Sequence, residues 1–254
     1  MVDIHCHILP GLDDGPATME ESLRMAENAI SEGITHIVAT PHCSDEFEFH
    51  YDRVLELRNE LQSAVGSKLE IATGCDFHLS PENLAALRFD ASPFCINRKS
   101  YLLVEFNEFA IPSLMDQTLH DLRLRGLYPV VTHPERNRIL CAHPERVVEW
   151  IRLGCCVQIT AGALLGSFGS TAKETAWSWI ERGMVQIVAS DGHNTTRRPL
   201  ALKHTFSLVA EKFGREIADV LFVKNPRAAY DGAPLPQMPH IQAAPARRKR
   251  FFFF

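Results

Sequence analysis

The sequence predicts a parallel α/β barrel formed by a single domain. Short β-branched runs alternate with amphipathic helical stretches almost to the end of the chain, and there are seven such runs. Alternating strands and helices imply parallel strands joined by right-handed crossovers, which leaves an open doubly wound sheet or a closed barrel. Seven repeats favour the barrel, and 254 residues suit one large domain of this class.

The expected strands are short and rich in β-branched residues. They are expected at residues 2–5, 34–39, 70–74, 102–105, 129–132, 156–159 and 186–189. The expected helices lie between them, near residues 18–32, 51–65, 113–125, 144–153, 171–182 and 200–213. The first helix has the clearest signals, because Thr18 and Glu21 have capping-box spacing and Gly33 follows its last turn.

The composition changes after about Gly232, where the chain becomes rich in Pro and Ala and then basic and aromatic. We therefore expect the folded domain to cover residues 1–231 and a flexible tail to cover residues 232–254. The tail ends in ARRKRFFFF, and basic residues beside aromatic ones can rest on an anionic membrane surface. The abrupt change in composition favours the alternative, an accidental or frayed terminus.

Composition also excludes several classes of protein. A net charge of -5 and a pI near 6.2 do not fit a nucleic-acid binder. No apolar run approaches the roughly 20 residues of a membrane span, and early polar residues such as Asp3 argue against a signal peptide. Seven scattered cysteines without a CxxC pair indicate neither a disulfide framework nor a structural zinc site. We therefore expect a protein of the reducing cytoplasm.

Side chains that bind metals follow six of the seven expected strands. They are His5 and His7, His42, Asp76, Glu105, His133, and the pair Asp191 and His193. The carboxyl ends of parallel strands meet at one rim, so we expect these side chains to converge there. His5 and His7 face the same side because side chains alternate along a strand. Asp13 and Asp14 lie in the next loop, and at least one of them can reach back over the rim.

Any one of these residues alone is more simply explained as a cap or a satisfied polar contact. Together, counting one aspartate of the pair, they give nine ligands, more than the three or four that a single zinc needs. The sequence therefore predicts two or three metal ions. Nitrogen and oxygen donors without thiolate suit manganese, iron or zinc better than copper(I).

No other nucleophile competes with metal chemistry. Cys43, Cys155 and Cys156 could suggest a thiol mechanism, but no cysteine is followed by arginine six residues later, as a cysteine phosphatase requires. The chain also lacks a Gly-Lys pair and a G-x-S-x-G elbow.

Two arginines are candidates for holding phosphate. Arg136 follows His133 by three residues, and a guanidinium offers a planar fork of donors to phosphate oxygens. The alternative for Arg136 is a surface salt bridge to Glu135 or Glu145. For Arg198 the two interpretations are about equally supported. The remaining histidines are expected to be structural or solvated, namely those at positions 36, 50, 120, 143, 204 and 240.

The motifs DIHCHILPGLDDG, TPH, LVEF, THPERN and SDGHN resemble the polymerase-and-histidinol-phosphatase (PHP) superfamily. Within it, the chain is most similar to the manganese-dependent protein-tyrosine phosphatases of bacterial capsule and exopolysaccharide loci, from Met1 to about Asp231. The resemblance implies a distorted seven-stranded (βα) barrel with a trinuclear metal cluster at the carboxyl rim. The ligands it implies are His5, His7, Asp14, His42, Asp76, Glu105, His133, Asp191 and His193.

The resemblance also assigns further roles. It places Arg136 and Arg198 at the phosphate, Asp14 as a ligand and Asp13 as a turn residue. Independently of the resemblance, Asp191 and His193 are catalytic candidates, because a protonated His or Asp near them could assist the leaving oxygen. One position departs from the family, since Asp76 stands where Glu is usual, and His78 or a water is then expected to complete the metal shell.

The function that the resemblance implies is hydrolysis of phosphotyrosine through attack by a metal-activated hydroxide. Its substrate would be a bacterial tyrosine kinase of capsule assembly, a membrane-associated protein, and the enzyme itself would be cytoplasmic. One alternative is a small-molecule phosphatase of the same fold, for instance one acting on histidinol phosphate. A nuclease-like PHP domain and a non-catalytic kinase-binding scaffold are further alternatives.

Overall fold

The structure, a computed structural model, describes residues 1–107 and 109–236. Every strand pairing in this part of the chain is parallel. The strands are β1 (Val2–Cys6), β2 (His36–Ala39), β3 (His42–Cys43), β4 (Glu70–Thr73), β5 (Asp76–His78), β6 (Tyr101–Glu105), β7 (Tyr128–Thr132), β8 (Cys156–Thr160) and β9 (Ile187–Ala189). All seven expected strands are present, and two short strands that were not expected, β3 and β5, follow the second and the third of them after a two-residue interruption.

The two interruptions divide the strands between two sheets. One sheet has the order β1-β2-β4 and the other has the order β3-β5-β6-β7-β8-β9. Strands β2 and β3 are separated by Thr40 and Pro41, and a proline cannot donate a ladder hydrogen bond. Strands β4 and β5 are separated by Gly74 and Cys75. A Cβ on Gly74 would lie 2.9 Å from Val38 Cγ1, so the chain passes too close to β2 for a larger residue.

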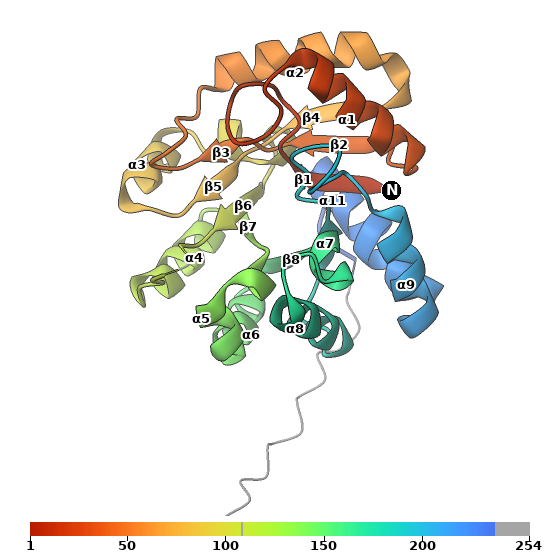
Figure 1. The fold of residues 1–254 in the computed structure, drawn as a ribbon. Coiled ribbons are helices and arrows are strands. Elements are labelled where there is room, and N and C mark those ends of the chain that lie inside the picture. The colour runs from red at the N-terminus through yellow and green to blue at the C-terminus, as the bar shows by residue number, and fades with distance from the viewer. Residues whose placement is uncertain (108, 237–254) are drawn as a thin grey trace, which may run out of the picture.

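The ring of strands returns to its start between β9 and β1. Cys6 forms a parallel bridge with Gly192, His7 N donates to Gly192 O at 2.8 Å, and Asp191 N donates to His5 O at 2.9 Å. Figure 1 shows the strands at the centre with helices arranged around them. The architecture is therefore the expected distorted parallel barrel, and the first and last strands meet at the rim.

The helices that cover the barrel begin close to their expected positions. They are α1 (Met19–Ser31), α2 (Tyr51–Val65), α4 (Leu114–Leu124), α6 (Pro144–Arg152), α8 (Ser170–Glu181) and α9 (Lys203–Phe213). The capping box of α1 is present, with Thr18 and Glu21 exchanging hydrogen bonds. Five further helices were not expected: α3 (Pro81–Phe89), α5 (Arg138–Ala142), α7 (Ala161–Leu165), α10 (Arg215–Asp219) and α11 (Asn225–Asp231).

Single helical turns complete the secondary structure of the described residues. The 3₁₀ turns are η1 (Gly66–Lys68), η2 (Ser92–Phe94), η3 (Ile96–Arg98) and η4 (Pro134–Arg136), and η5 (Val220–Lys224) is a π-helical turn.

Helix α11 closes the amino end of the barrel. Ala229 and Tyr230 pack with inward-facing strand residues, among them Ile4, Val38 and Leu103. The Tyr230 hydroxyl donates to Glu70 Oε1 at 2.9 Å, at the start of β4. A separate, larger core fills the space between the strands and the surrounding helices. Because the interior is packed and its amino end is covered, the carboxyl rim is the end at which a site can be open.

The expected start of the tail coincides with the end of α11, where Gly232 adopts a left-handed conformation at φ 72°. The next residues still contact the barrel, since the Tyr101 hydroxyl donates to Ala233 O at 2.8 Å and Leu235 packs against the inner core. Residues 237–254, which include the basic and aromatic end, lie outside the described residues. Within the described part, no helix has both the length and the apolar character that crossing a membrane requires.

Candidate metal centre

His5 and His7 project from the carboxyl end of β1 into the rim. His5 Nδ1 hydrogen-bonds Gln158 Oε1 at 2.8 Å, so its Nε2 faces the centre of the ring. There it lies 3.3 Å from Asp76 Oδ2 and 3.4 Å from Asp191 Oδ1. A histidine that binds a metal through one ring nitrogen commonly forms a hydrogen bond through its other ring nitrogen. Gln158 therefore orients His5 for ligation, a role that the sequence analysis did not assign.

Asp13 plays the same part for His7. Its Oδ2 lies 2.6 Å from His7 Nδ1 and also accepts the backbone N–H of His42 at 3.0 Å, while its Oδ1 accepts Gly15 N at 3.0 Å. Burial alone would lower the pKa of His7, but the charge and hydrogen bond of Asp13 raise that pKa to about 10. Asp13 is thus the expected turn residue and, in addition, the residue that directs His7 Nε2 inward.

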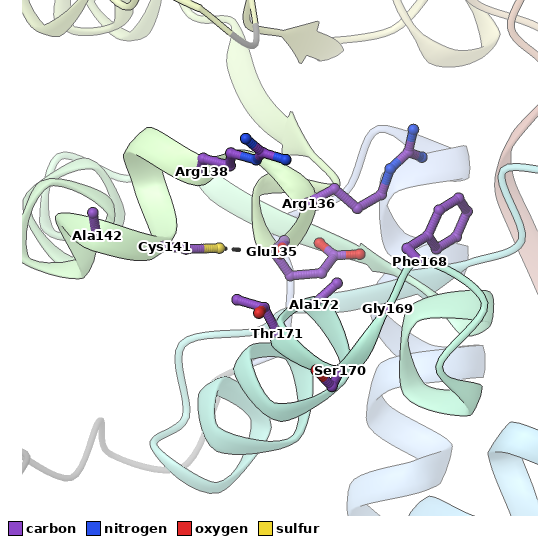
Figure 2. A pocket seen from close by; sticks show the side chains of 10 residues that line it. All are labelled: Glu135, Arg136, Arg138, Cys141, Ala142, Phe168, Gly169, Ser170, Thr171 and Ala172. Atoms are coloured by element: carbon purple, nitrogen blue, oxygen red, sulfur yellow. Dashed lines mark hydrogen bonds between the residues drawn. The ribbon is translucent and has the colours of Figure 1, made fainter.

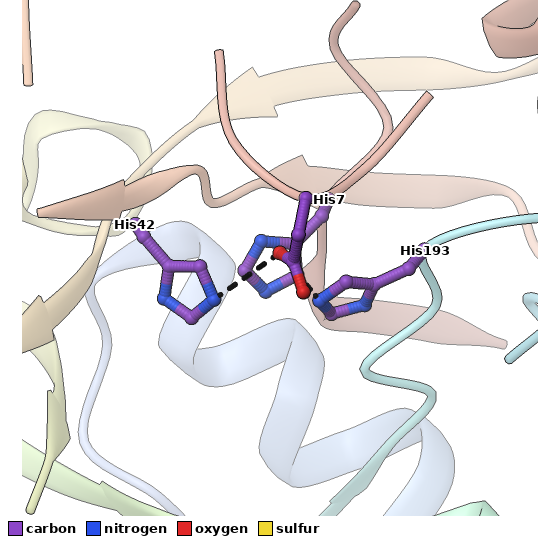
Figure 3. A group of neighbouring side chains, drawn as sticks. His7, His42 and His193 are labelled. Carbon is purple, nitrogen blue, oxygen red and sulfur yellow. Dashed lines mark ion pairs between the residues drawn. The ribbon is translucent and has the colours of Figure 1, made fainter. Parts of the chain in front are cut away.

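Asp14 lies between two histidines from distant segments. Its Oδ1 is 3.2 Å from His193 Nε2 and 3.5 Å from His42 Nε2. Figure 3 shows the rings of His42 and His193 with that of His7 beside them. One donor atom from each of the four residues lies within 4.8 Å of the others. Burial would raise the pKa of Asp14, but hydrogen bonds with His193 and His42 outweigh it and hold that pKa well below its usual range.

Asp76, Glu105 and His133 form the opposite side of the centre. His133 Nε2 lies 3.6 Å from Glu105 Oε1 and 3.8 Å from Asp76 Oδ2. His42 links this side to Asp14, since its Nδ1 lies 3.6 Å from Asp76 Oδ2 and 3.5 Å from Glu105 Oε2. His78, the expected alternative ligand, belongs to none of the donor groups found among the described residues.

The protonation of this side reflects its crowding. Burial would raise the pKa of Asp76, but the charge of His5 and the hydrogen bond with His133 hold it well below its usual range. Burial and the charge of Asp76 raise the pKa of Glu105 to about 7. Burial and the charge of Arg136 lower the pKa of His133 to about 4, which keeps its imidazole neutral, as a metal ligand must be.

Asp191 joins the two expected phosphate-binding arginines to the histidines. Its Oδ1 faces His5 and His7, while its Oδ2 accepts Arg136 Nη1 and Arg198 Nη2, each at 2.6 Å. Burial would raise the pKa of Asp191, but the charge of His5 and the hydrogen bond with His7 hold that pKa well below its usual range. Asp191 has a positive φ of 53°, an uncommon conformation that functional sites often contain. Arg136 therefore pairs with Asp191 and sits at the rim.

Phe168 lies beneath both arginines and was missed in the sequence analysis. The Arg136 guanidinium lies 4.3 Å from the centre of its ring, and that of Arg198 lies 6.0 Å from it. Gly162 makes room for the ring, since a Cβ there would lie 3.0 Å from Phe168 Cε2. The available signal is weak: a phenylalanine in the Gly-rich loop G-S-F-G after the sixth expected strand.

The donor set fits a cluster of divalent cations. Four overlapping groups of three or four residues bring their donor atoms within 4.8 Å of one another, and these groups contain all nine residues expected as ligands. Asp76 Oδ2 and His193 Nε2 are buried and have ion-pair contacts within the cluster, but neither atom has a hydrogen bond of good geometry in the described structure. Such acceptors are costly unless a ligand such as a cation satisfies them. Fold and site together define a metal-binding parallel α/β barrel.

Residues 1–230 match the family described as "Capsular polysaccharide synthesis, CpsB/CapC". The chain belongs to this family. It is 30% identical over 261 residues to tyrosine-protein phosphatase YwqE of Bacillus subtilis, covering all of both chains. It is 34% identical over 211 residues to putative tyrosine-protein phosphatase CapC of Staphylococcus aureus, covering 82% of each.

A solved structure supports the same assignment. This solved structure comes from a study of YwqE from Bacillus subtilis and CpsB from Streptococcus pneumoniae, which are called "unique metal-dependent tyrosine phosphatases". The match has a TM-score of 0.87 at 30% identity and covers 96% of this chain and all of the other. The predicted family and barrel class are thus confirmed.

Proposed function

We propose that this protein is a metal-dependent tyrosine phosphatase that hydrolyses phosphotyrosine in a protein substrate. The observation that carries the proposal is the cluster of nine nitrogen and oxygen donors with Arg136 and Arg198 at its edge. Family membership over almost the whole described chain supports it, because the relatives bear the name tyrosine-protein phosphatase.

The proposed cofactor is two or three manganese ions, with iron or zinc as alternatives. The proposed ligands are His5, His7, Asp14, His42, Asp76, Glu105, His133, Asp191 and His193. Clustered divalent cations supply charge neutralisation at phosphoryl oxygens and lower the pKa of a water nucleophile.

The two arginines are proposed to hold the phosphoryl group. Each places one nitrogen on Asp191 Oδ2, which fixes the guanidinium beside the cluster, and Arg198 Nη1 also lies 3.9 Å from Asp14 Oδ2. A guanidinium held in this way can present its remaining N–H groups to phosphate oxygens. Asp191 thus acts as their anchor as well as a ligand. Stabilising charge that develops on the transferred group is typically the largest contribution to such catalysis.

His193 and Asp191 are better suited to ligation and positioning than to donating a proton. His193 Nδ1 lies 2.9 Å from the backbone O of Asp191, which can only accept, so Nδ1 carries the proton and Nε2 keeps its lone pair. Asp191 is held ionised. A phenolate leaving group, with a conjugate acid of pKa about 10, needs less help from an acid than an alkoxide does.

The physiological substrate is proposed to be a phosphotyrosine-bearing protein, specifically a membrane-associated tyrosine kinase of capsule assembly. The capsular polysaccharide family supports this choice. A cytoplasmic location is proposed because all seven cysteines are free thiols, which suits a reducing compartment.

The test compares initial rates on a phosphotyrosyl peptide and on histidinol phosphate, each with and without added manganese. We expect hydrolysis of the peptide that depends on manganese and clearly exceeds that of histidinol phosphate. A preference for histidinol phosphate would replace the proposal with a small-molecule phosphatase. Absence of turnover on both substrates with each candidate metal would indicate a binding scaffold.

A further inference from the structure

A cavity of about 730 Å³ lies beside the metal centre. Its walls come from η4 and α5 on one side and from the start of α8 on the other, and Figure 2 shows them facing each other. Arg136 belongs to both places, because it lines the cavity and donates to Asp191 at the centre. A substrate whose phosphate is held by Arg136 therefore has this cavity directly beside it. The volume lies within the usual range for ligand pockets.

The cavity offers one guanidinium that pairs with no described carboxylate, that of Arg138. Arg138 is exposed, lines the cavity and forms no ion pair with any described residue. Helix α8 begins at Ser170 without a side-chain cap, and its first residues Ser170, Thr171 and Ala172 line the cavity. The first N–H groups of a helix lack partners within it, and they favour an anion.

The cavity also contains an unpaired acceptor. Glu135 lines it and is only 1% exposed. Its Oε1 accepts both the N–H and the hydroxyl of Thr160, at 2.8 and 2.9 Å, whereas its Oε2 is buried with no partner among the described residues. Because Oε2 is buried behind the cavity wall, the group that a ligand can reach there is the Arg138 guanidinium, and an acidic side chain of a peptide segment would complement it.

We propose that this cavity binds substrate residues next to the phosphotyrosine, and that Arg138 with the start of α8 selects an acidic side chain there. This proposal rests on the proposed function. The acidic preference follows from two features of the cavity lining that both favour an anion, the Arg138 guanidinium and the uncapped start of α8 on the facing wall. Arg138 is then a specificity-determining residue, one that touches the flanking peptide and leaves the phosphate to Arg136.

The experiment measures kcat/KM on phosphotyrosyl peptides that differ only by Glu or Gln at each of the three positions on either side of the phosphotyrosine. For the wild-type enzyme we expect at least one Glu peptide to exceed its Gln partner by about five- to tenfold, as a charge-assisted hydrogen bond implies. Arg138→Gln should bring this ratio close to one. Arg138→Glu should favour a Lys peptide at the same position. Arg215→Gln, on the exposed surface of α10, is the matched control and should keep the wild-type ratio.

A second variant tests the cavity without changing charge. Ala142 is exposed and lines the cavity, so Ala142→Trp should fill it. We expect kcat/KM on the preferred peptide to fall severalfold more than kcat/KM on p-nitrophenyl phosphate, which has no flanking residues. Equal effects on both substrates would overturn the proposal. It would also be overturned if the ratio of kcat/KM on the Glu peptide to kcat/KM on the Gln peptide were near one in the wild type, or if Arg138→Gln kept the wild-type ratio. A wild-type enzyme that hydrolyses no phosphotyrosyl peptide would instead refute the proposed function.

Discussion

Replacing Asp13 should weaken metal binding although Asp13 is not a proposed ligand. Its Oδ2 lies 2.6 Å from His7 Nδ1, and the same carboxylate accepts the backbone N–H groups of Gly15 and His42. In Asp13→Asn, the single amide oxygen cannot replace both carboxylate oxygens, so at least one of these contacts is lost and the negative charge disappears.

The expected magnitude follows from the role of the contact. Residues that orient a metal-binding histidine typically contribute 10- to 100-fold in metal affinity or activity, equivalent to about 1.4–2.7 kcal/mol. We therefore expect the manganese concentration for half-maximal activity to rise by about 10- to 100-fold, with activity partly restored at high manganese. The pKa of His7, which Asp13 holds at about 10, should fall in the metal-free variant.

The assay is a manganese titration of chelator-treated enzyme, with p-nitrophenyl phosphate hydrolysis and calorimetric metal binding measured in parallel. Asp52→Asn, on the exposed first turn of α2, serves as the control for loss of one carboxylate. A half-maximal manganese concentration within twofold of the wild type, in an Asp13→Asn protein of unchanged melting temperature, would refute the orienting role.

Three further predictions concern other parts of the molecule. Phe168→Ala removes the ring whose centre lies 4.3 Å from the Arg136 guanidinium, so kcat/KM should fall by about fivefold. Phe168→Tyr keeps an aromatic ring and should stay near the wild-type kcat/KM. Equal losses in both variants would argue against a ring that supports Arg136. Chelation should lower the melting temperature, because the buried carboxylates then face one another without cations. Adding manganese at 100 times its Kd should restore about 2.7 kcal/mol of stability, measured by urea unfolding, and an unchanged urea midpoint would contradict the proposed cluster. Asp116→Ala leaves the buried Trp150 indole N–H and the Arg146 guanidinium without their shared acceptor. The free energy of unfolding in the same assay should therefore drop by about 1–3 kcal/mol. A drop below about 0.5 kcal/mol would show that water replaces the carboxylate.

The strand pattern and the rim residues could be predicted because both depend on local sequence. The β-branched runs mark the strands, and six of the seven are followed by a donor that parallel pairing must bring to the same end. The breaks at Thr40–Pro41 and Gly74–Cys75 could not be predicted in the same way. They change which strand pairs with which, and this pairing depends on contacts such as that of Gly74 with Val38.

The supporting residues of the site were harder to predict than its donors. Asp13 and Asp14 are adjacent carboxylates, and only the folded loop shows that one faces His7 and the other faces His193 and His42. Gln158 lies within a buried strand and looks like any polar core residue. Phe168 is an aromatic residue in a loop, so no periodic pattern distinguishes it. These roles arise from contacts between segments far apart in the sequence.

The closure of the barrel by α11 has a consequence for biosynthesis. The first strand carries His5 and His7, yet the inner core against which it packs is completed only by Ala229 and Tyr230. In a nascent chain on the ribosome, His5 and His7 therefore cannot take up their folded positions until nearly all of the barrel has been translated. Premature stop codons before residue 225 should yield polypeptides that proteases clear rather than partly active enzyme.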